Sequence, residues 1–239
     1  MKGIRLRGQS GLAWCAIAVA CLLLATGSAG ADDTIVVTNF TSDKLVDSAP
    51  AGWKLEQKGG TLNLAVEKRD DTFVLHLKSD STSSYGIARE IEIKAETYPF
   101  LAWKWKVEKL PAGGDVRSAG TDDQAVQVYV LFEETGWPAK LKTPIVAYIW
   151  DNECPKGTVV TSPQPFAEKV RYVVLRDKTD RLGTWFTEKR NVFDDYMKLF
   201  PDIDGGKPRN IKAISLYINS QHTKSEAESY IGEMYFSKD

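Results

Sequence analysis

The stretch LAWKWKV, residues 101–107, decides how the rest of the chain is interpreted. In a β-strand successive side chains point to opposite faces, so one face carries Leu101, Trp103, Trp105 and Val107. The other face carries Ala102, Lys104 and Lys106. The two indoles are either core side chains or a stacking platform for sugar rings. Their aliphatic neighbours favour the core, because a binding platform mixes aromatic with polar groups.

The N-terminus has the pattern of a secretory signal peptide. An apolar run over 12–25 follows three basic residues and precedes the small residues of 29–31. The run is shorter than the ~20 residues of a membrane-spanning helix. We expect cleavage after Ala31 and a periplasmic or secreted protein with no membrane span in the mature chain. Residues 1–31 are then the leader, and residues 32–239 form one domain.

Composition excludes some classes of function. Removal of the leader leaves 28 basic and 32 acidic residues, a net charge of −4. Nucleic-acid binding requires a basic field that such a chain lacks. Cys154 is the one cysteine outside the leader, so no internal disulfide is expected. Its role is open between a reactive thiol and a bystander in a turn.

Short alternating or β-branched runs, separated by Gly, Pro, Asp and Ser, predict strands. These runs are residues 35–40, 61–67, 72–79, 86–94, 100–108, 124–133, 144–151, 170–177, 210–219 and 229–237. The KRDD segment at 68–71 predicts a hairpin turn. Helical spacing occurs only within 188–200, which predicts one short helix near 191–200 that ends before Pro201. The chain is therefore expected to be an all-β protein, a single-domain β-sandwich of jelly-roll type.

Several strands mix aromatic with polar side chains on one face. Gln127 and Tyr129 lie opposite an apolar face of valines. Similar mixing occurs at Tyr148 and Trp150, at Tyr172 and Arg176, and at Ser215, Tyr217 and Asn219. If these strands are neighbours, one sheet carries a face suited to carbohydrate, whose rings pack on aromatics and whose hydroxyls bind amides and guanidinium groups. An ordinary solvent-exposed face fits the Gln127 and Tyr129 pattern as well.

Two further groups are candidates for ligand binding. Asp122 and Asp123 precede the Gln127 strand and could bind a cation or sugar hydroxyls, although aspartates also cap the turns that begin strands. Trp185 and Arg190 belong to the segment WFTEKRNVFDDY. Arg190 either forms a structural ion pair with a nearby carboxylate or presents its guanidinium to an acidic glycan.

Catalysis is the weaker hypothesis from the residues. A polysaccharide lyase would use a base such as His76 or Tyr129, and a glycosidase would use two carboxylates about 5–9.5 Å apart. No zinc-binding spacing, P-loop or dinucleotide fingerprint occurs in the sequence.

The order of motifs resembles a family of exported bacterial proteins, the domain of unknown function DUF3047. The resemblance rests on YPFLAWKWKVEKLPAGGDV (98–116), GTDDQAVQVYVLFE (120–133), YIWDN (148–152), VVLRD (173–177), GTWFTEKRNVFDDYMKLF (183–200) and YIGEMYF (230–236). The family has no established activity. The resemblance implies a galactose-binding-like jelly roll, the architecture of many carbohydrate-binding modules, with function following only by analogy.

Such modules often hold a structural Ca²⁺, but this chain departs from the family at residues 219–223. The family has an acidic stretch there, whereas this chain has Asn219, Ser220, Gln221, His222 and Thr223. Amides and imidazole in place of carboxylates disfavour an oxygen-rich Ca²⁺ site. The acidic positions left for a metal are Asp122, Asp123 and Glu233, and the presence of any metal is open.

The expectation is an exported, non-catalytic β-sandwich that binds a carbohydrate or another envelope polymer. The alternatives are a structural domain of an envelope complex and a polysaccharide lyase or hydrolase. The predicted ligand-binding residues are Lys104, Asp122, Asp123, Gln127, Tyr129, Trp150, Arg176, Trp185 and Arg190.

Overall fold

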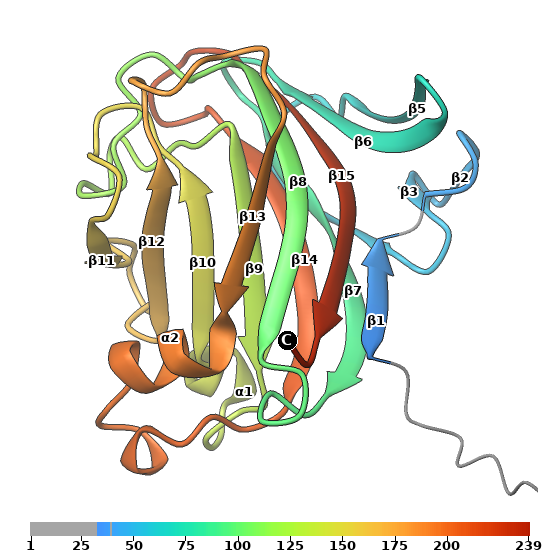
Figure 1. Cartoon of the computed structure of the whole chain (residues 1–239). Coiled ribbons are helices and arrows are strands. Elements are labelled where there is room, and N and C mark those ends of the chain that lie inside the picture. Colours follow the sequence, from blue (N-terminus) through green and yellow to red (C-terminus); the bar gives the residue numbers. More distant parts are fainter. Residues whose placement is uncertain (1–32, 39) are drawn as a thin grey trace, which may run out of the picture. The chain divides into compact units, whose positions relative to one another are not determined.

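The structure is a computed structural model that describes residues 33–38 and 40–239, and the predicted leader at 1–31 lies outside this range. Two large β-sheets face each other within the described part of the chain (Figure 1), which confirms the predicted all-β sandwich. Most of the strands are short and apolar on at least one face, as the alternating runs require.

The first large sheet has six strands in the order β13-β8-β15-β6-β5, and β1 also pairs with β15. All of its pairs are antiparallel. Its strands are β1 (Thr34–Thr38), β5 (Leu64–Arg69), β6 (Thr72–Ser79), β8 (Phe100–Lys109), β13 (Phe186–Asn191) and β15 (Ala227–Ser237). The pairing of Arg69 with Thr72 confirms the hairpin predicted at 68–71.

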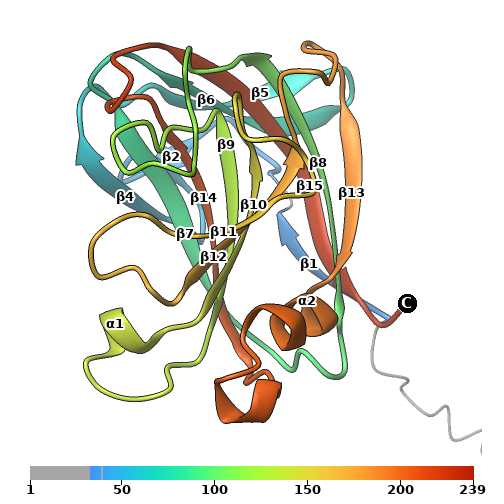
Figure 2. The same cartoon turned by 90° about the vertical axis from the view of Figure 1, so that its left-hand side faces the viewer.

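The second large sheet has seven strands in the order β11-β12-β10-β9-β14-β7-β4, seen from its outer side in Figure 2. The pair of β10 and β12 is parallel. Its strands are β4 (Lys54–Gly59), β7 (Ser84–Ile93), β9 (Val126–Phe132), β10 (Ile145–Trp150), β11 (Val159–Thr161), β12 (Val170–Arg176) and β14 (Ile211–Asn219). The smaller elements are β2 (Leu45–Val46), β3 (Ala49–Pro50), α1 (Ala139–Lys142), α2 (Val192–Leu199) and the 3₁₀ turn η1 (Asp204–Gly206).

The core between the sheets confirms the interpretation of LAWKWKV. Its four side chains Leu101, Trp103, Trp105 and Val107 are all fully buried. The indole of Trp105 packs on Trp150 of the opposite sheet with ring centroids 6.0 Å apart. Trp103 packs in the same way on Tyr148, at 5.3 Å. These aromatic pairs join the two sheets.

The helix is confirmed but begins later than its helical spacing suggested. Residues Phe186–Asn191 pair with β8 as an edge strand, and α2 occupies only Val192–Leu199. Asn191 caps α2 because its side-chain oxygen accepts a hydrogen bond from Asp194 N. The Asn191 cap therefore separates strand from helix within the predicted helical segment.

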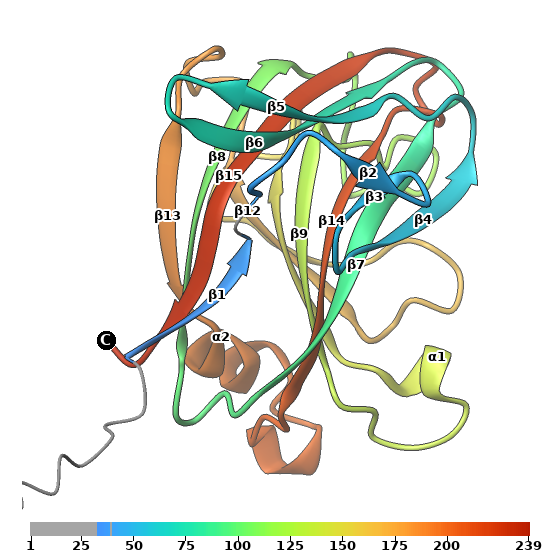
Figure 3. The same cartoon turned by 90° about the vertical axis from the view of Figure 1, so that its right-hand side faces the viewer.

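The strand β15 changes partners along its length, and this change positions the site described below. Its first half pairs with β6 through Ile231, and its second half pairs with β1 from Met234 onward. Figure 3 shows β6 crossing one end of β15 and β1 lying along the other. Gly232 and Glu233 lie between these two partners, where the register with β8 also shifts. No helix in the described residues is long and apolar enough to span a membrane.

Candidate functional site

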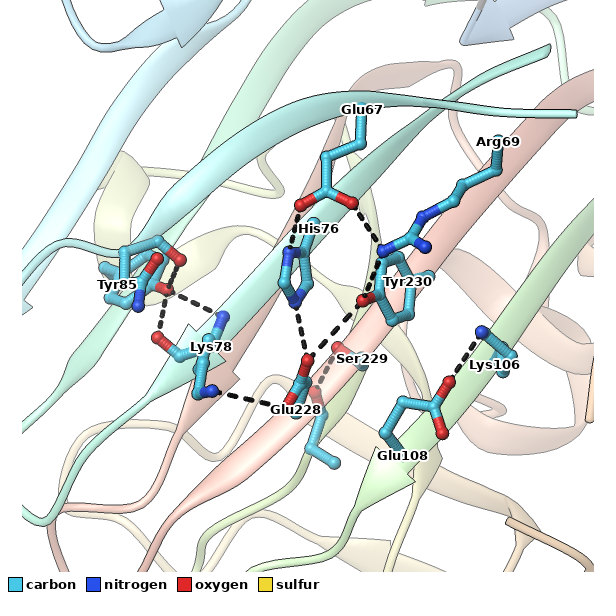
Figure 4. Close-up of polar contacts among 12 residues, drawn as sticks. Glu67, Arg69, His76, Lys78, Tyr85, Lys106, Glu108, Glu228, Ser229 and Tyr230 are labelled. Carbon is cyan, nitrogen blue, oxygen red and sulfur yellow. Dashed lines mark hydrogen bonds and ion pairs between the residues drawn. The ribbon is translucent and has the colours of Figure 1, made fainter. Parts of the chain in front are cut away.

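The outer face of the six-stranded sheet carries a cluster of polar and aromatic side chains. His76 of β6 and Tyr230 of β15 point away from the core, because the strand neighbours of each are fully buried. Figure 4 shows both side chains beside residues of β5 and β15. We refer to this group as the histidine cluster, which consists of Glu67, Arg69, His76, Glu228 and Tyr230.

His76 is held between two carboxylates. Its Nδ1 lies 2.7 Å from Glu67 Oε1, and its Nε2 lies 2.9 Å from Glu228 Oε1. The imidazole stacks on the ring of Tyr230 with centroids 4.3 Å apart. Arg69 donates hydrogen bonds to Glu67 Oε2 at 2.7 Å and to the hydroxyl of Tyr230 at 3.1 Å. The cluster is therefore rigid, because each of its side chains is held by at least one other.

The carboxylates of the cluster are poorly suited to act as general acids. Burial raises the pKa of Glu67, but hydrogen bonds and charge from His76 and Arg69 outweigh burial and lower it overall. For Glu228 the same balance, with His76 and Lys78, also gives a lowered pKa. A general acid must keep its proton near neutral pH. These two groups act as fixed negative charges.

Lys106 connects the histidine cluster to the indole of Trp185. Its Nζ lies 4.4 Å from the ring centroid of Tyr230 and 5.5 Å from that of Trp185, within range of cation–π attraction. The same ammonium pairs with Glu108 at 2.6 Å. Trp185 itself is 39% exposed, so one part of its ring is available to a ligand.

A cavity of about 670 Å³ opens beside Trp185, at the point where β15 changes partner. We refer to it as the tryptophan cavity. It is lined by Thr38, Phe40, Thr41, Asp70, Asp71, Thr72, Phe73, Val74, Lys104, Trp185, Thr187, Gly232 and Glu233. A Cβ at position 232 would contact Trp185 and Lys104 at 3.7 and 3.4 Å. These are ordinary van der Waals distances, so the indole lies one side-chain contact away from the backbone of β15.

The polar groups of the tryptophan cavity are hydroxyls and charges. Lys104 Nζ pairs with Glu233 Oε1 at 2.7 Å, and the hydroxyl of Thr38 donates to the carbonyl of Gly232 at 2.8 Å. Asp70 and Asp71 are exposed in the β5–β6 turn. Among the described residues, no side chain forms an ion pair with either of these two carboxylates. They are therefore open to hydroxyl donors of a ligand.

The outer face of the seven-stranded sheet carries a second polar group. The rings of Tyr172 and Tyr217 lie 6.3 and 6.4 Å from that of Tyr129. Tyr129 donates a hydrogen bond to the side-chain oxygen of the buried Gln127. The Gln127 amide donates in turn to Asn219 Oδ1 at 2.5 Å. Burial raises the pKa of Tyr129 well above its usual range, so its hydroxyl keeps its proton.

Three buried aspartates, Asp122, Asp123 and Asp151, extend this hydrogen-bond network from the seven-stranded sheet into the adjoining loops. Asp122 accepts hydrogen bonds from Gln124 and Gln164 at 3.2 and 3.0 Å, and burial raises its pKa. Asp123 accepts from the backbone N and the hydroxyl of Thr223 at 2.6 and 2.8 Å. The groups that donate these hydrogen bonds to Asp122 and Asp123 all belong to the protein's own side chains or backbone. The network thus fastens loops to the sheet.

Asp151 provides a pH-dependent test of this network. Burial raises its pKa to about 6, against the lowering effect of hydrogen bonds from Cys154 N and Val116 N. We expect the carboxyl carbon of Asp151 to titrate near pH 6 by NMR. The carboxyl of Asp80, whose pKa is lowered by hydrogen bonds from Ser83 and Thr82, should titrate below its usual range.

The raised pKa of Asp151 in the folded state makes the free energy of unfolding depend on pH in a defined direction. The folded chain binds the Asp151 proton more tightly than the unfolded chain, so this contribution is present at low pH. It is lost as pH rises from about 4 toward 6. The variant Asp151→Asn should therefore gain stability relative to the wild type over that interval in denaturant titrations. A difference independent of pH would contradict the buried, proton-binding state of Asp151.

No group of three or more His, Cys, Asp or Glu side chains within residues 33–38 and 40–239 is placed to hold a metal ion. Asp122 and Asp123 lie beside the seven-stranded sheet, whereas Glu233 lies in the tryptophan cavity on the other sheet. The three acidic positions considered for a metal are thus divided between two places. Cys154 is a buried free cysteine, and burial raises its pKa.

The sequence motifs identified above extend through both sheets, and a family model covers them. The model of "Protein of unknown function (DUF3047)" matches residues 51–235. The chain belongs to the DUF3047 family. Its match includes β4 to most of β15, and therefore both polar faces described here. No curated protein sequence matches this DUF3047 chain.

Solved structures of similar fold are distant from the DUF3047 chain. One is a family 11 carbohydrate-binding module of a cellulosomal cellulase of Clostridium thermocellum, with 7% identity, 87% and 96% of the two chains covered and a TM-score of 0.44. Another is the xyloglucanase domain of a type three effector from Sinorhizobium fredii, with 10% identity, 79% and 93% covered and a TM-score of 0.43. A likeness at this level carries no argument about the function of this chain.

The nine predicted ligand residues of the DUF3047 chain do not form one surface. Lys104 and Trp185 meet in the tryptophan cavity. Gln127, Tyr129, Asp122 and Asp123 lie together at the other sheet, and all but Tyr129 are buried. The prediction that Trp150 shares the face of Gln127 is wrong, because Trp150 is opposite Val126 in the β9–β10 register and fully buried in the core.

The two predicted arginines occupy the edge of the sandwich. Arg176 Nε pairs with Glu188 at 2.6 Å, and its guanidinium covers the ring of Phe186 at 3.6 Å from the centroid. Arg176 thus faces Trp150 rather than the outer face of Tyr129, contrary to prediction. Arg190 forms a bidentate ion pair with Asp195, which is the structural alternative considered for it.

Sequence reasoning missed the histidine cluster and most of the tryptophan cavity. His76 was considered only as a possible base of a lyase, although its alternation with the apolar Leu75 and Leu77 placed it on an outer face. The usable signal was the polar alternation of LAVEKR, which aligns Glu67 and Arg69 on one side of the hairpin partner strand. Phe40 and the threonines of the cavity carried no such signal.

Proposed function

We propose that the DUF3047 chain is an exported, non-catalytic module that binds a carbohydrate in the tryptophan cavity. One observation carries the proposal: a cavity of about 670 Å³ contains a partly exposed indole together with hydroxyl, ammonium and carboxylate groups. Sugar rings pack their C–H faces on aromatic rings, and their hydroxyls need both hydrogen-bond donors and hydrogen-bond acceptors as partners.

The surroundings of the cavity support binding without reaction. The histidine cluster holds its titratable groups in mutual contacts, and the lowered pKa values of Glu67 and Glu228 keep these two carboxyls from acting as general acids at neutral pH. Export is proposed from the leader at 1–31. The rigid cluster, through Lys106, fixes the indole of Trp185 as a preformed surface.

A binding experiment tests the proposal. The chain without its proposed leader, residues 32–239, is applied to a glycan array that includes neutral, acidic and envelope polysaccharides. Calorimetry then measures the affinity for the glycan that binds most strongly. The variant Trp185→Ala should weaken that affinity about 10- to 100-fold, as expected for a central aromatic contact. Trp137→Ala removes an equally large but 89% exposed indole outside the cavity, and it should leave the affinity unchanged.

Two results would remove the proposal. One is a folded sample that binds no glycan on the array. The other is a bound glycan whose affinity is equal in Trp185→Ala and Trp137→Ala, because the site would then lie elsewhere, with the face around Tyr129 as the next candidate.

A further inference from the structure

A second cavity lies at the edge of the sandwich, away from the tryptophan cavity. Its volume is about 480 Å³, and it lies between β12 of one sheet, β13 of the other and the helix α2. We refer to it as the cationic cavity. Its lining consists of Lys156, Gly157, Val159, Val173, Val174, Leu175, Arg190, Asp195, Lys198 and Leu199.

The charges of the cationic cavity are unbalanced. Three cationic residues come from three different segments, whereas Asp195 is the one acidic residue in the lining. Asp195 is already neutralised, since it accepts both hydrogen bonds of Arg190 at 2.7 and 3.0 Å and a third from Tyr148 at 2.7 Å. The lining therefore keeps a net charge of +2, in a mature chain whose net charge is −4.

The two lysines differ in how far their charge is compensated. Lys156 Nζ lies 3.3 Å from both carboxylate oxygens of Asp180, an aspartate that also pairs with Arg176 at 3.1 Å. Lys198 is exposed in the last turn of α2 and forms no ion pair with the residues that the structure describes. Lys198 is consequently the free cation of the lining, and Lys156 is a second cation that already has Asp180 as a partner.

The remaining walls are aliphatic. Val159, Val173, Leu175 and Leu199 contribute only hydrocarbon to the cavity, and Val159 is 51% exposed. A simple inorganic anion would pair with the lysines but leave these side chains facing water. An anion that carries a short hydrocarbon body would satisfy both parts, because burial of apolar surface adds to the ionic attraction.

We propose that the cationic cavity binds a carboxylate with a short aliphatic body. The carboxylate lies between Lys156 and Lys198, and its hydrocarbon covers the side chains of Val159 and Leu199. This site does not depend on the proposed glycan binding, because the two cavities share no lining residue.

Titration with matched ligands tests the proposal. Octanoate, octanol and octylammonium are added separately to the exported form of the chain with labelled methyl groups, and NMR follows the Val159, Val173, Leu175 and Leu199 signals. Octanoate should shift these signals at a concentration at least ~10-fold lower than octanol, and octylammonium should not shift them. Added salt should weaken the octanoate response. Equal responses to octanoate and octanol, or octanoate shifts confined to other methyl groups, would overturn the proposal.

Charge-removing variants provide the control. The double variant Lys156→Gln and Lys198→Gln should weaken octanoate binding about 10-fold or more, while Lys207→Gln, which removes an exposed lysine outside the cavity, should not. The variant Trp185→Ala should also bind octanoate as the wild type does, so that loss of glycan binding and loss of anion binding are separate results. An equal loss in Lys207→Gln would show a nonspecific charge effect and reject the site.

Discussion

Replacement of Trp105 by Ala should lower the free energy of unfolding by about 3–5 kcal/mol, a large part of a total of about 5–15 kcal/mol. The indole is fully buried, packs edge-on against Trp103 at 5.4 Å and contacts Trp150 across the sandwich. Its Nε1 also donates a hydrogen bond to Glu188 Oε1 at 3.1 Å. The variant thus creates a cavity and removes one partner of a half-buried carboxylate. Urea unfolding followed by circular dichroism measures the loss.

The comparison with Trp185→Ala makes the Trp105 result specific. Trp185 lies on the outer face and is partly exposed, so its removal should cost no more than about 2 kcal/mol. Equal losses for the two variants, or a Trp105→Ala protein as stable as the wild type, would contradict the assignment of the odd-numbered side chains of β8 to the core.

Replacement of Asp123 by Ala should also cost about 3–5 kcal/mol, the range for removing one partner of a buried charge pair or network. The carboxylate is fully buried, and it accepts hydrogen bonds from Thr223 N, the Thr223 hydroxyl and Asn219 Nδ2. Alanine would leave these donors without an acceptor. The loop that joins β14 to β15 would then lose its attachment to the segment before β9.

Asp43→Ala is a suitable control for Asp123→Ala, because Asp43 is an exposed aspartate and its removal should change stability by about 0.5 kcal/mol or less. Hydrogen exchange should show faster exchange at Thr223 N in the Asp123 variant only. A stable Asp123→Ala protein that instead loses glycan binding would restore the ligand-binding role predicted for Asp123 from the sequence.

Alternation was sufficient to predict strands that have one apolar and one polar face. For β8 and the β5–β6 hairpin it gave both the element and the direction of the side chains. It failed for β10, where Ala147 and Ile149 are buried under loops while Tyr148 and Trp150 are buried in the core. Both faces of that strand are apolar, so the pattern contains no information about which face meets the other sheet.

The edge strand β13 and the tryptophan cavity were beyond prediction for other reasons. Glu188 and Arg190 point inward along β13, where ion pairs with Arg176 and Asp195 at the edge of the sandwich satisfy their charges. Charged side chains at inward positions break the apolar alternation expected of a strand, so the segment was grouped with the helical pattern that follows it. The cavity depends on the exchange of partners along β15, a long-range arrangement that no local pattern encodes. Trp185 was predicted as a ligand residue from its place in the segment WFTEKRNVFDDY, but not with Thr38 and Asp70 as neighbours.

The pairing of β1 with the end of β15 has a practical consequence for engineering. Thr34 is opposite Ser237, and Lys238 N donates to the carbonyl of Asp33 at 3.2 Å, so the two ends of the described fold leave from one corner. A short linker between them, with new termini opened between the exposed residues Arg181 and Leu182, would give a circular permutant that keeps every strand pair. Bulky tags on both ends would compete for the same space.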